Sequence, residues 1–443
     1  MVSENYASYE PLSFTVTVDN LEFDETTGFV VQCDFAAFIH EWWHYFQDIS
    51  TVTGQNGFYL WLRDMTRISK ITCTKVGEKI IIPLQRDEYG EIMSKYRALY
   101  NIFCGEKKEE RIENAKITKN PDIDKLPLDI DGEQRILPRC TLIINSKDFE
   151  FGLIVLQEIN CYYAQKIAEG YVQDKPRVPA DSLPEYPYKT GEMLFEYYGI
   201  KSDDKCKFLI TYLCLDSIQA PAVFLNLMKR LAGQTLSFDN DIDNIVKWVD
   251  EEAAKVSWSN DDIYKEWAKD YSNWANDQGH EHFVAAIQWF IMKWLLTDRL
   301  RFDHGKAFFI KKFCMNIGNL NHLYSIFPVP VFKRNGELLG SSMKGACPVI
   351  DFQDEFDNAL ILWFHKRVFE LLSIKSIDKL GDLAECKIYD KCPYRGKVDR
   401  DYDCKTAVWE VVQNEKQAKC PFAVALHSMG LWQNKLVVSV GEE

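Results

Sequence analysis

Residues 35–49, FAAFIHEWWHYFQDI, constrain most tightly how this chain can fold. At about 100° per residue, a helix through this segment collects its apolar side chains on one side. That apolar side consists of Phe35, Phe38, Ile39, Trp42, Phe46 and Ile49. The other side carries a narrow polar stripe of His40, His44, Gln47 and Thr51. Asp34 is a suitable N-cap, so we predict a helix over 34–49 whose aromatic face enters a core and holds the polar stripe in place.

The polar stripe contains His40-Glu41-Trp42-Trp43-His44, an HExxH pattern. Histidines four apart on a helix project side by side and can bind one zinc ion, while the glutamate reaches the metal-bound water. With only 8 histidines in the chain, chance produces this pattern on the order of once in a hundred such sequences. A merely solvated helix face is the alternative, but such faces usually carry Lys and Glu. We therefore predict His40 and His44 as metal ligands and Glu41 as a general base.

A hydrolytic zinc site needs a third protein ligand and one open position. The residue six after His44 is Ser50, so a compact third-histidine site is excluded. Glu158 lies in the middle of the apolar run GLIVLQEINCYYAQ (152–165), and burying a carboxylate is costly unless it is paired or binds a metal. We predict Glu158 as the third ligand, with Glu192 and Glu196 as its rivals.

The segment HEWWHYFQD, followed by a glutamate on a later helix, resembles the gluzincin group of zinc metallopeptidases. In that group the HExxH helix supplies two ligands and the base, and a second helix supplies a glutamate ligand. The resemblance implies these roles for His40, His44, Glu41 and Glu158. Asp48 stands four residues after His44, where several gluzincins carry an aspartate; it is a candidate acceptor for a ligating imidazole N–H, or else a surface carboxylate. The resemblance covers two helices, and the separation between His44 and Glu158 is much longer than in thermolysin-like enzymes.

The expected chemistry needs one further group. Zinc lowers the pKa of bound water, Glu41 takes the proton and delivers it to the leaving amine, and a donor stabilises the oxyanion. The resemblance implies a Tyr, His or Arg from downstream as that donor. The candidates are Tyr162, Tyr163, His280 and His282. The two histidines have an alternative role as structural or solvated groups in a helix N-terminal turn.

The last 60 residues carry Cys386, Cys392, Cys404 and Cys420. Four thiolates can hold a second, structural zinc ion, but the spacing lacks a C-x₂-C knuckle. Buried apolar thiols are the competing interpretation. One catalytic zinc ion is therefore the main expectation for cofactors.

Charge and composition restrict the partners. A formal net charge of −14 disfavours a general nucleic-acid or anionic-membrane binder, because phosphate contacts need clustered Lys and Arg. No stretch approaches the ~20 apolar residues that span a bilayer, and MVSENYASYE does not read as a secretory signal. Thirteen cysteines without such a signal indicate the reducing cytoplasm. The expected partners are a protein or peptide substrate and a regulatory protein.

The predicted fold is α+β and mainly helical: a zincin-like core with a small N-terminal sheet, then a helical region and a Cys-containing C-terminal segment. The expected domains are 1–200 (with an insertion at about 71–145), 201–345 and 346–443. Strands are predicted at 14–18, 29–33, 79–84 and 136–144, and helices at 34–49, 57–68 after a break at Gly54–Gly57, 151–170, much of 205–316, and 355–372. We expect 105–125 to be an exposed loop or insertion, and 177–188 to be a linker or an ordered loop beside a cleft.

These observations favour a zinc metallopeptidase acting on a restricted protein substrate. Two alternatives stay open: a zinc metallohydrolase of a non-peptide substrate, and a binding or regulatory protein that retains the metal site without catalysis. The intact Glu41 argues against the second alternative, because a purely structural site has no need of a base.

Overall fold

The computed structural model describes most of the N-terminal two thirds of the chain and parts of the rest. The described residues are 7–11, 14–19, 23–24, 28–29, 35–74, 77–82, 104–105, 108–130, 133–171, 176–256, 273, 281–329, 331–333, 338–340, 352–372, 421–431 and 435–438. Within them the fold is α+β and mainly helical, as predicted. None of the described helices combines the length and apolarity needed to cross a membrane.

A small mixed sheet lies beside the HExxH helix. Its order is β1(Ala7–Glu10), β2(Thr15–Val18), β11(Val331–Lys333), β12(Leu338–Gly340). The β1–β2 and β11–β12 pairs are antiparallel, and β2 pairs with β11 in parallel. A short antiparallel pair, β3(Phe23–Asp24) and β4(Gly28–Phe29), follows. The strand predicted at 14–18 is thus confirmed, whereas most of 29–33 lies outside the described residues.

The HExxH helix is α1(Phe35–Ser50), and its aromatic face is fully buried. The next helix, α2(Val52–Thr74), runs straight through Gly54 and Gly57, so the predicted break at these glycines is wrong. The chain breaks instead at Thr51, whose hydroxyl accepts the backbone N–H of Gly54 (3.2 Å). Gly54 serves close packing, because a Cβ there would lie 2.3 Å from the Cα of Asp48.

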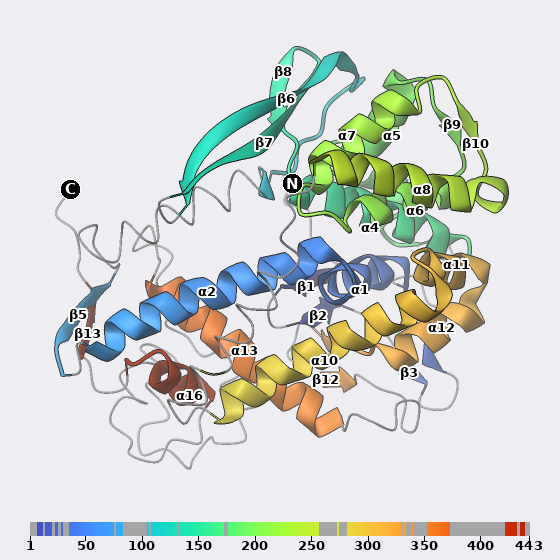
Figure 1. Cartoon of the computed structure of the whole chain (residues 1–443). Helices are drawn as coiled ribbons and strands as arrows, with labels where there is room; N and C mark the ends of the chain where they lie inside the picture. The colour runs from blue at the N-terminus through green and yellow to red at the C-terminus, as the bar shows by residue number, and fades with distance from the viewer. Residues whose placement is uncertain are drawn as a thin grey trace.

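The region expected as an insertion forms an antiparallel sheet of β6(Ile117–Ile130), β7(Glu133–Ile144) and β8(Lys147–Glu150). The expectation of a loop over 105–125 is therefore wrong for its second part. Strand β6 pairs with β7 from Ile117↔Ile144 to Ile130↔Glu133. This pairing satisfies the backbone hydrogen bonds of the charged segment, and its composition gives no sign of it. The curved sheet stands beside α7 (Figure 1). A separate parallel pair joins β5(Lys79–Ile82) to β13(Lys435–Val438).

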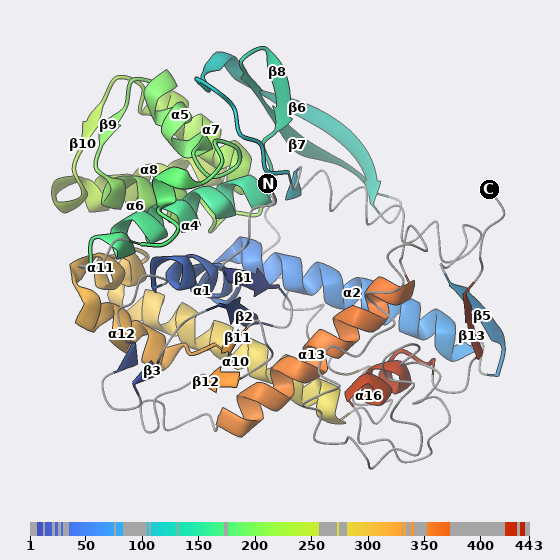
Figure 2. The same ribbon diagram turned by 180° about the vertical axis from the view of Figure 1, so that it is seen from behind.

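The remaining elements are mainly helices. They are α4(Leu153–Glu169), η1(Ala180–Ser182), α5(Thr190–Tyr197), α6(Asp204–Cys214), α7(Ala220–Arg230), α8(Phe238–Val256), α10(Glu281–His304), α11(Phe308–Met315), α12(Ile317–Ile326), α13(Phe352–Leu372) and α16(Pro421–Ser428), with the parallel strands β9(Lys201–Ser202) and β10(Thr235–Leu236). Helices α4 to α8 form one group, and α10, α13 and α16 lie with α2 in another (Figures 1 and 2). The predicted helices at 151–170 and 355–372 are confirmed.

Helix α1 lies between these groups, packing against α4 on one side and α10 on the other. Trp43, which lies next to the polar stripe, shows how the helix is fixed: its ring lies 4.8 Å from that of Phe313 and 4.9 Å from that of Phe208. Its indole N–H donates to Asn160 of α4 (2.7 Å). The orientation of α1, and so of its polar stripe, is therefore set by burial of aromatic side chains and by hydrogen bonds to α4.

Candidate metal centre

The packing of α1 on α4 brings His40, His44 and Glu158 together. The Nε2 atom of His40 lies 3.2 Å from Oε2 of Glu158, and the Nε2 atom of His44 lies 3.1 Å from the same oxygen. The two imidazole ring centroids are 5.1 Å apart. Three residues chosen from two distant segments of sequence thus converge on one point at the interface of two helices.

Gln165, two turns after Glu158, fixes the orientation of His40. Its amide nitrogen donates to the carbonyl of Val178 (2.9 Å), which leaves its oxygen facing Nδ1 of His40 at 3.1 Å. Nδ1 therefore carries the proton, and a neutral imidazole then presents the lone pair of Nε2 to Glu158. Nε2 of His40 and Oε2 of Glu158 are both acceptors in that state. Two acceptors at this distance need a shared cation, either a proton or a metal ion.

The charges around Glu158 favour a bound cation. Burial by itself raises the pKa of Glu158, but the imidazoles of His44 and His40 overcome it and hold the pKa well below its usual range. Burial lowers the pKa of His44, yet Cys161 and Glu158 together raise it well above the ordinary value. A partly buried acid that stays ionised and the His44 imidazole, which attracts a proton, thus form a pair in which a divalent ion can take the place of that proton.

Tyr9 of β1 connects the small sheet to this centre. Its ring is stacked on that of His44, with centroids 6.1 Å apart and planes 9° from parallel. Its hydroxyl donates to Asp48 (2.6 Å), and its backbone N–H donates to the carboxylate of Glu41. The predicted role of Asp48 was to accept an imidazole N–H; the structure gives it the hydroxyl of Tyr9 as partner, and Gln165 takes that role for His40.

The carboxylates on α1 have raised pKa values. Burial raises the pKa of Glu41, against the lowering effect of His40 and His44. Burial also raises the pKa of Asp48 to about 7, although the Tyr9 hydroxyl and His44 lower it. A glutamate beside the two imidazoles whose pKa is shifted toward neutrality is suited to accept and release a proton.

The predicted oxyanion donors are not brought to the centre by any contact within the described residues. The hydroxyl of Tyr162 donates to Asp181 (3.4 Å), and the ring of Tyr163 lies under the amine of Lys207 at 5.7 Å. His280 and the side chain of His282 lie outside the described residues, as do Cys386, Cys392, Cys404 and Cys420.

The rival third ligands are engaged elsewhere. Glu192 on α5 pairs with Lys207 (2.5 Å), and Glu196 on the same helix is exposed. Neither has a described contact with His40 or His44. Of the three acids that the sequence offered, Glu158 alone contacts the two imidazoles within the part of the chain described.

Besides Tyr9 and Gln165, sequence reasoning assigned no role to two further residues at the centre. Tyr188 lies with its ring centroid 5.7 Å from that of His40, and its hydroxyl donates to Glu109 (2.9 Å). The segment 176–189 around it is ordered and carries η1, which agrees with the ordered-loop alternative and not with a linker. Tyr188 could not be predicted as part of the centre, because the sequence of the 176–189 segment does not show that this segment packs against His40.

Cys161 is the second missed residue. One nitrogen of each of His40 and His44 and the sulfur of Cys161 lie within 4.8 Å of one another. Burial raises the pKa of this thiol to about 12. Helical spacing places Cys161 on the same helix face as Glu158, but this spacing alone does not show that the thiol approaches the two imidazoles.

No family model, curated protein or solved structure matches this chain.

Proposed function

We propose that this protein is a zinc-dependent metallopeptidase with a zincin-like core. The observation that carries the proposal is the convergence of two imidazole Nε2 atoms on one carboxylate oxygen at 3.1 and 3.2 Å. The orientation of His40 by Gln165 strengthens it, because that arrangement places a lone pair against a carboxylate and so calls for a cation.

The donor set suits zinc. Nitrogen and oxygen ligands bind this ion at about 2.0–2.2 Å, so donors on a tetrahedral zinc ion lie roughly 3.3 Å apart. The separations from Glu158 to His40 and to His44 are close to that value. When bound, zinc supplies a Lewis acid that activates water and polarises a carbonyl.

Three residues of the chain would carry out proton transfer, positioning of the base and stabilisation of the oxyanion. Glu41 accepts the proton of the attacking water and passes it to the leaving amine. The backbone N–H of Tyr9 holds the Glu41 carboxylate in position. Tyr188, beside His40, is the group best placed to donate to the oxyanion, after its hydroxyl turns away from Glu109.

Peptide substrates are favoured by two considerations. The first is the resemblance of the two helices to those of gluzincins. The second is that β1 ends the described four-stranded sheet, and an extended chain can pair with an edge strand beyond Tyr9, whose own N–H is bonded to Glu41. Cys140, Cys161, Cys206 and Cys214 are buried free thiols, as expected in the reducing cytoplasm that we propose for this protein.

The proposal is tested with Glu41→Gln. Zinc-loaded protein is incubated with a quenched-fluorescent peptide library and with fluorescein-labelled casein. We expect the variant to keep its fold and one zinc ion and to lose hydrolysis by about 10³-fold, because it cannot accept a proton. Glu192→Gln, a change in an acid that pairs with Lys207, is the matched control and should hydrolyse normally. Normal turnover by Glu41→Gln would show that Glu41 is not the base.

A further inference from the structure

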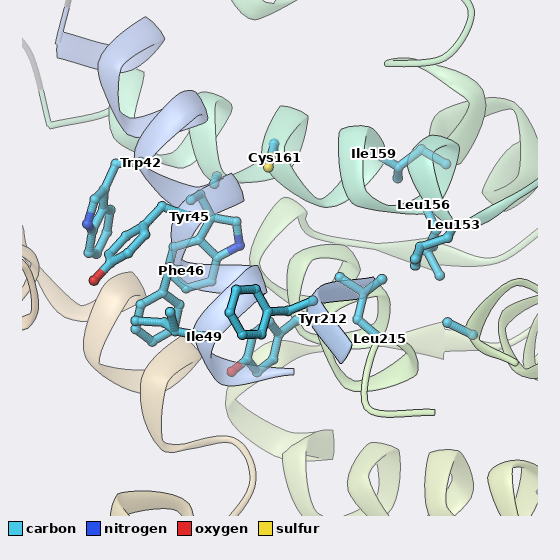
Figure 3. Packing of buried hydrophobic residues seen from close by; sticks show 14 of the residues in the cluster. Trp42, Tyr45, Phe46, Ile49, Leu153, Leu156, Ile159, Cys161, Tyr212 and Leu215 are labelled. Atoms are coloured by element: carbon cyan, nitrogen blue, oxygen red, sulfur yellow. The ribbon is translucent and has the colours of Figure 1, made fainter. Parts of the chain in front are cut away.

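Cys161 occupies a singular position among the buried cysteines that the structure describes. It lies on α4, one turn after Glu158, and is fully buried at the interface with α1 (Figure 3). Its sulfur and one nitrogen of each of His40 and His44 lie within 4.8 Å of one another. Glu158 contacts the same two imidazoles. The two histidines thus contact the Glu158 carboxylate and also lie close to the Cys161 thiol.

Cys214 provides the contrast. It is also fully buried, on α6, and only burial acts on the pKa of its thiol. Cys161 hydrogen-bonds to His44 and lies within electrostatic range of Glu158 and Glu41. The surroundings of Cys214 are those of a small apolar side chain, whereas the surroundings of Cys161 are those of a metal ligand.

We propose that Cys161 is a fourth protein ligand of the metal ion and closes the site in the resting protein. This inference rests on the proposed function, because it concerns the regulation of that same centre. Zinc sites with four protein ligands are structural, while hydrolytic sites keep one position open. A thiolate in the fourth position therefore holds the enzyme latent. This restrains a peptidase that shares its compartment with its potential substrates.

The geometry makes the closure reversible. On release, the Cys161 thiolate would take up a proton from water and rotate away about its own side-chain torsion, and a water molecule would take its place, while Glu158, three residues earlier on the helix, stays bound. A substrate or partner that binds the open form more tightly than the closed form shifts the equilibrium toward the open form. The size of this shift is set by the difference between its two affinities. The two His ligands and Glu158 then remain as the three protein ligands that hydrolysis requires.

Cobalt substitution tests the ligand directly. Metal-free full-length protein is loaded with one equivalent of Co²⁺, and its near-ultraviolet absorption is recorded. A thiolate bound to Co²⁺ gives a sulfur-to-metal charge-transfer band, whereas nitrogen and oxygen ligands do not. We expect the band in the wild type and in the control Cys214→Ser. We expect no band in Cys161→Ser, which should still bind one Co²⁺ through the other three ligands.

A second readout measures closure. Zinc-loaded Cys161→Ser and Cys161→Ala are compared with wild type on the peptide library. We expect hydrolysis to rise by at least about tenfold, as when a form populated below about 10% becomes dominant. Two substitutions guard against a folding defect in either one, which circular dichroism detects.

The outcomes separate this inference from the proposed function. One bound Co²⁺ without a charge-transfer band in the wild type would overturn the role of Cys161, and so would a band that persists in Cys161→Ser; both leave hydrolysis untouched. A band that depends on Cys161, in a protein whose variants never hydrolyse peptides, supports the ligand and contradicts the peptidase. Equal hydrolysis by wild type and both variants would overturn the closure.

Discussion

Two polar clusters lie side by side in the interface between α1 and α4, and they differ in how their hydrogen bonds are satisfied. In the first, Asn160 accepts from Trp43 (2.7 Å) and Gln47 (2.9 Å), and donates to the Phe208 carbonyl (3.0 Å) and Thr211 (2.8 Å). All four bonds of its amide are made with neutral partners. In the second, two residues earlier on α4, one oxygen of Glu158 faces two imidazoles.

The difference teaches how to distinguish a structural polar cluster from a functional one. A buried amide with all its donors and acceptors paired contributes to packing and specificity and needs nothing more. Titratable groups that crowd around one oxygen are balanced only when a cation joins them. The Asn160 network therefore holds the two helices together, and the Glu158 cluster is where we propose the metal ion.

The largest expected effect is on metal affinity. Glu158→Gln removes the anionic ligand and should weaken zinc binding by about 10³-fold, or about 4 kcal/mol. Competition with a chelator dye measures this affinity. Asn160→Asp, which adds a carboxylate two residues away, should not restore zinc binding in the Glu158→Gln background. If Glu158→Gln binds zinc as tightly as the wild type, the Glu158 cluster does not differ from the Asn160 network in metal binding.

The next effect is on stability. Asn160→Ala leaves Trp43 and Thr211 without their partner, so we expect the free energy of unfolding to fall by about 3 kcal/mol. Urea titration of metal-free protein measures the loss. Folded Asn160→Ala should still bind one zinc ion. A variant that loses zinc but keeps full stability would assign the two clusters the opposite roles.

A smaller effect concerns Asp48 and pH. Because its pKa in the folded protein is about 7, above that of the unfolded chain, the folded state binds the proton more tightly. Its contribution to the free energy of unfolding is therefore present below about pH 4 and is lost as pH rises toward 7. Asp48→Asn should remove this dependence, so its stabilising effect on metal-free protein should be about 4 kcal/mol larger at pH 8 than at pH 4. Parallel pH profiles of wild type and variant would contradict it.

The smallest effect is that of Tyr9. Tyr9→Phe keeps the ring against His44 but removes the hydrogen bond to Asp48. We expect zinc affinity to fall about tenfold, as is typical when a partner that supports a ligand is lost. Tyr198→Phe, which removes only an exposed hydrogen bond to Asn120, is the control. If the two variants bind zinc equally, Tyr9 does not support the centre.

Part of the metal centre could be predicted from the sequence. Helical periodicity was sufficient to place His40 and His44 on a face opposite the buried aromatics, and the cost of burying an acid in an apolar helix singled out Glu158. Local patterns of this kind depend on neighbours within two turns, which the sequence shows directly. The same patterns predicted the helical character of the chain and several strands.

The rest depends on contacts between distant segments. Tyr9 and Tyr188 reach the centre through the packing of β1 and the 176–189 segment, and such packing leaves no periodic signal in the sequence. The strand at 117–125 was missed for the same reason, because its stability comes from pairing with β7. Gly54 was taken as a break, although its missing side chain admits the close approach of α1.

Metal stoichiometry tests the central claim most directly. Full-length protein expressed in zinc-supplemented medium and purified without chelators is examined by elemental analysis, together with His40→Ala and His44→Ala. The account predicts one bound zinc ion at the α1–α4 centre of the wild type and almost none there in either variant. A wild type without metal, or variants that retain it in full, would contradict the account.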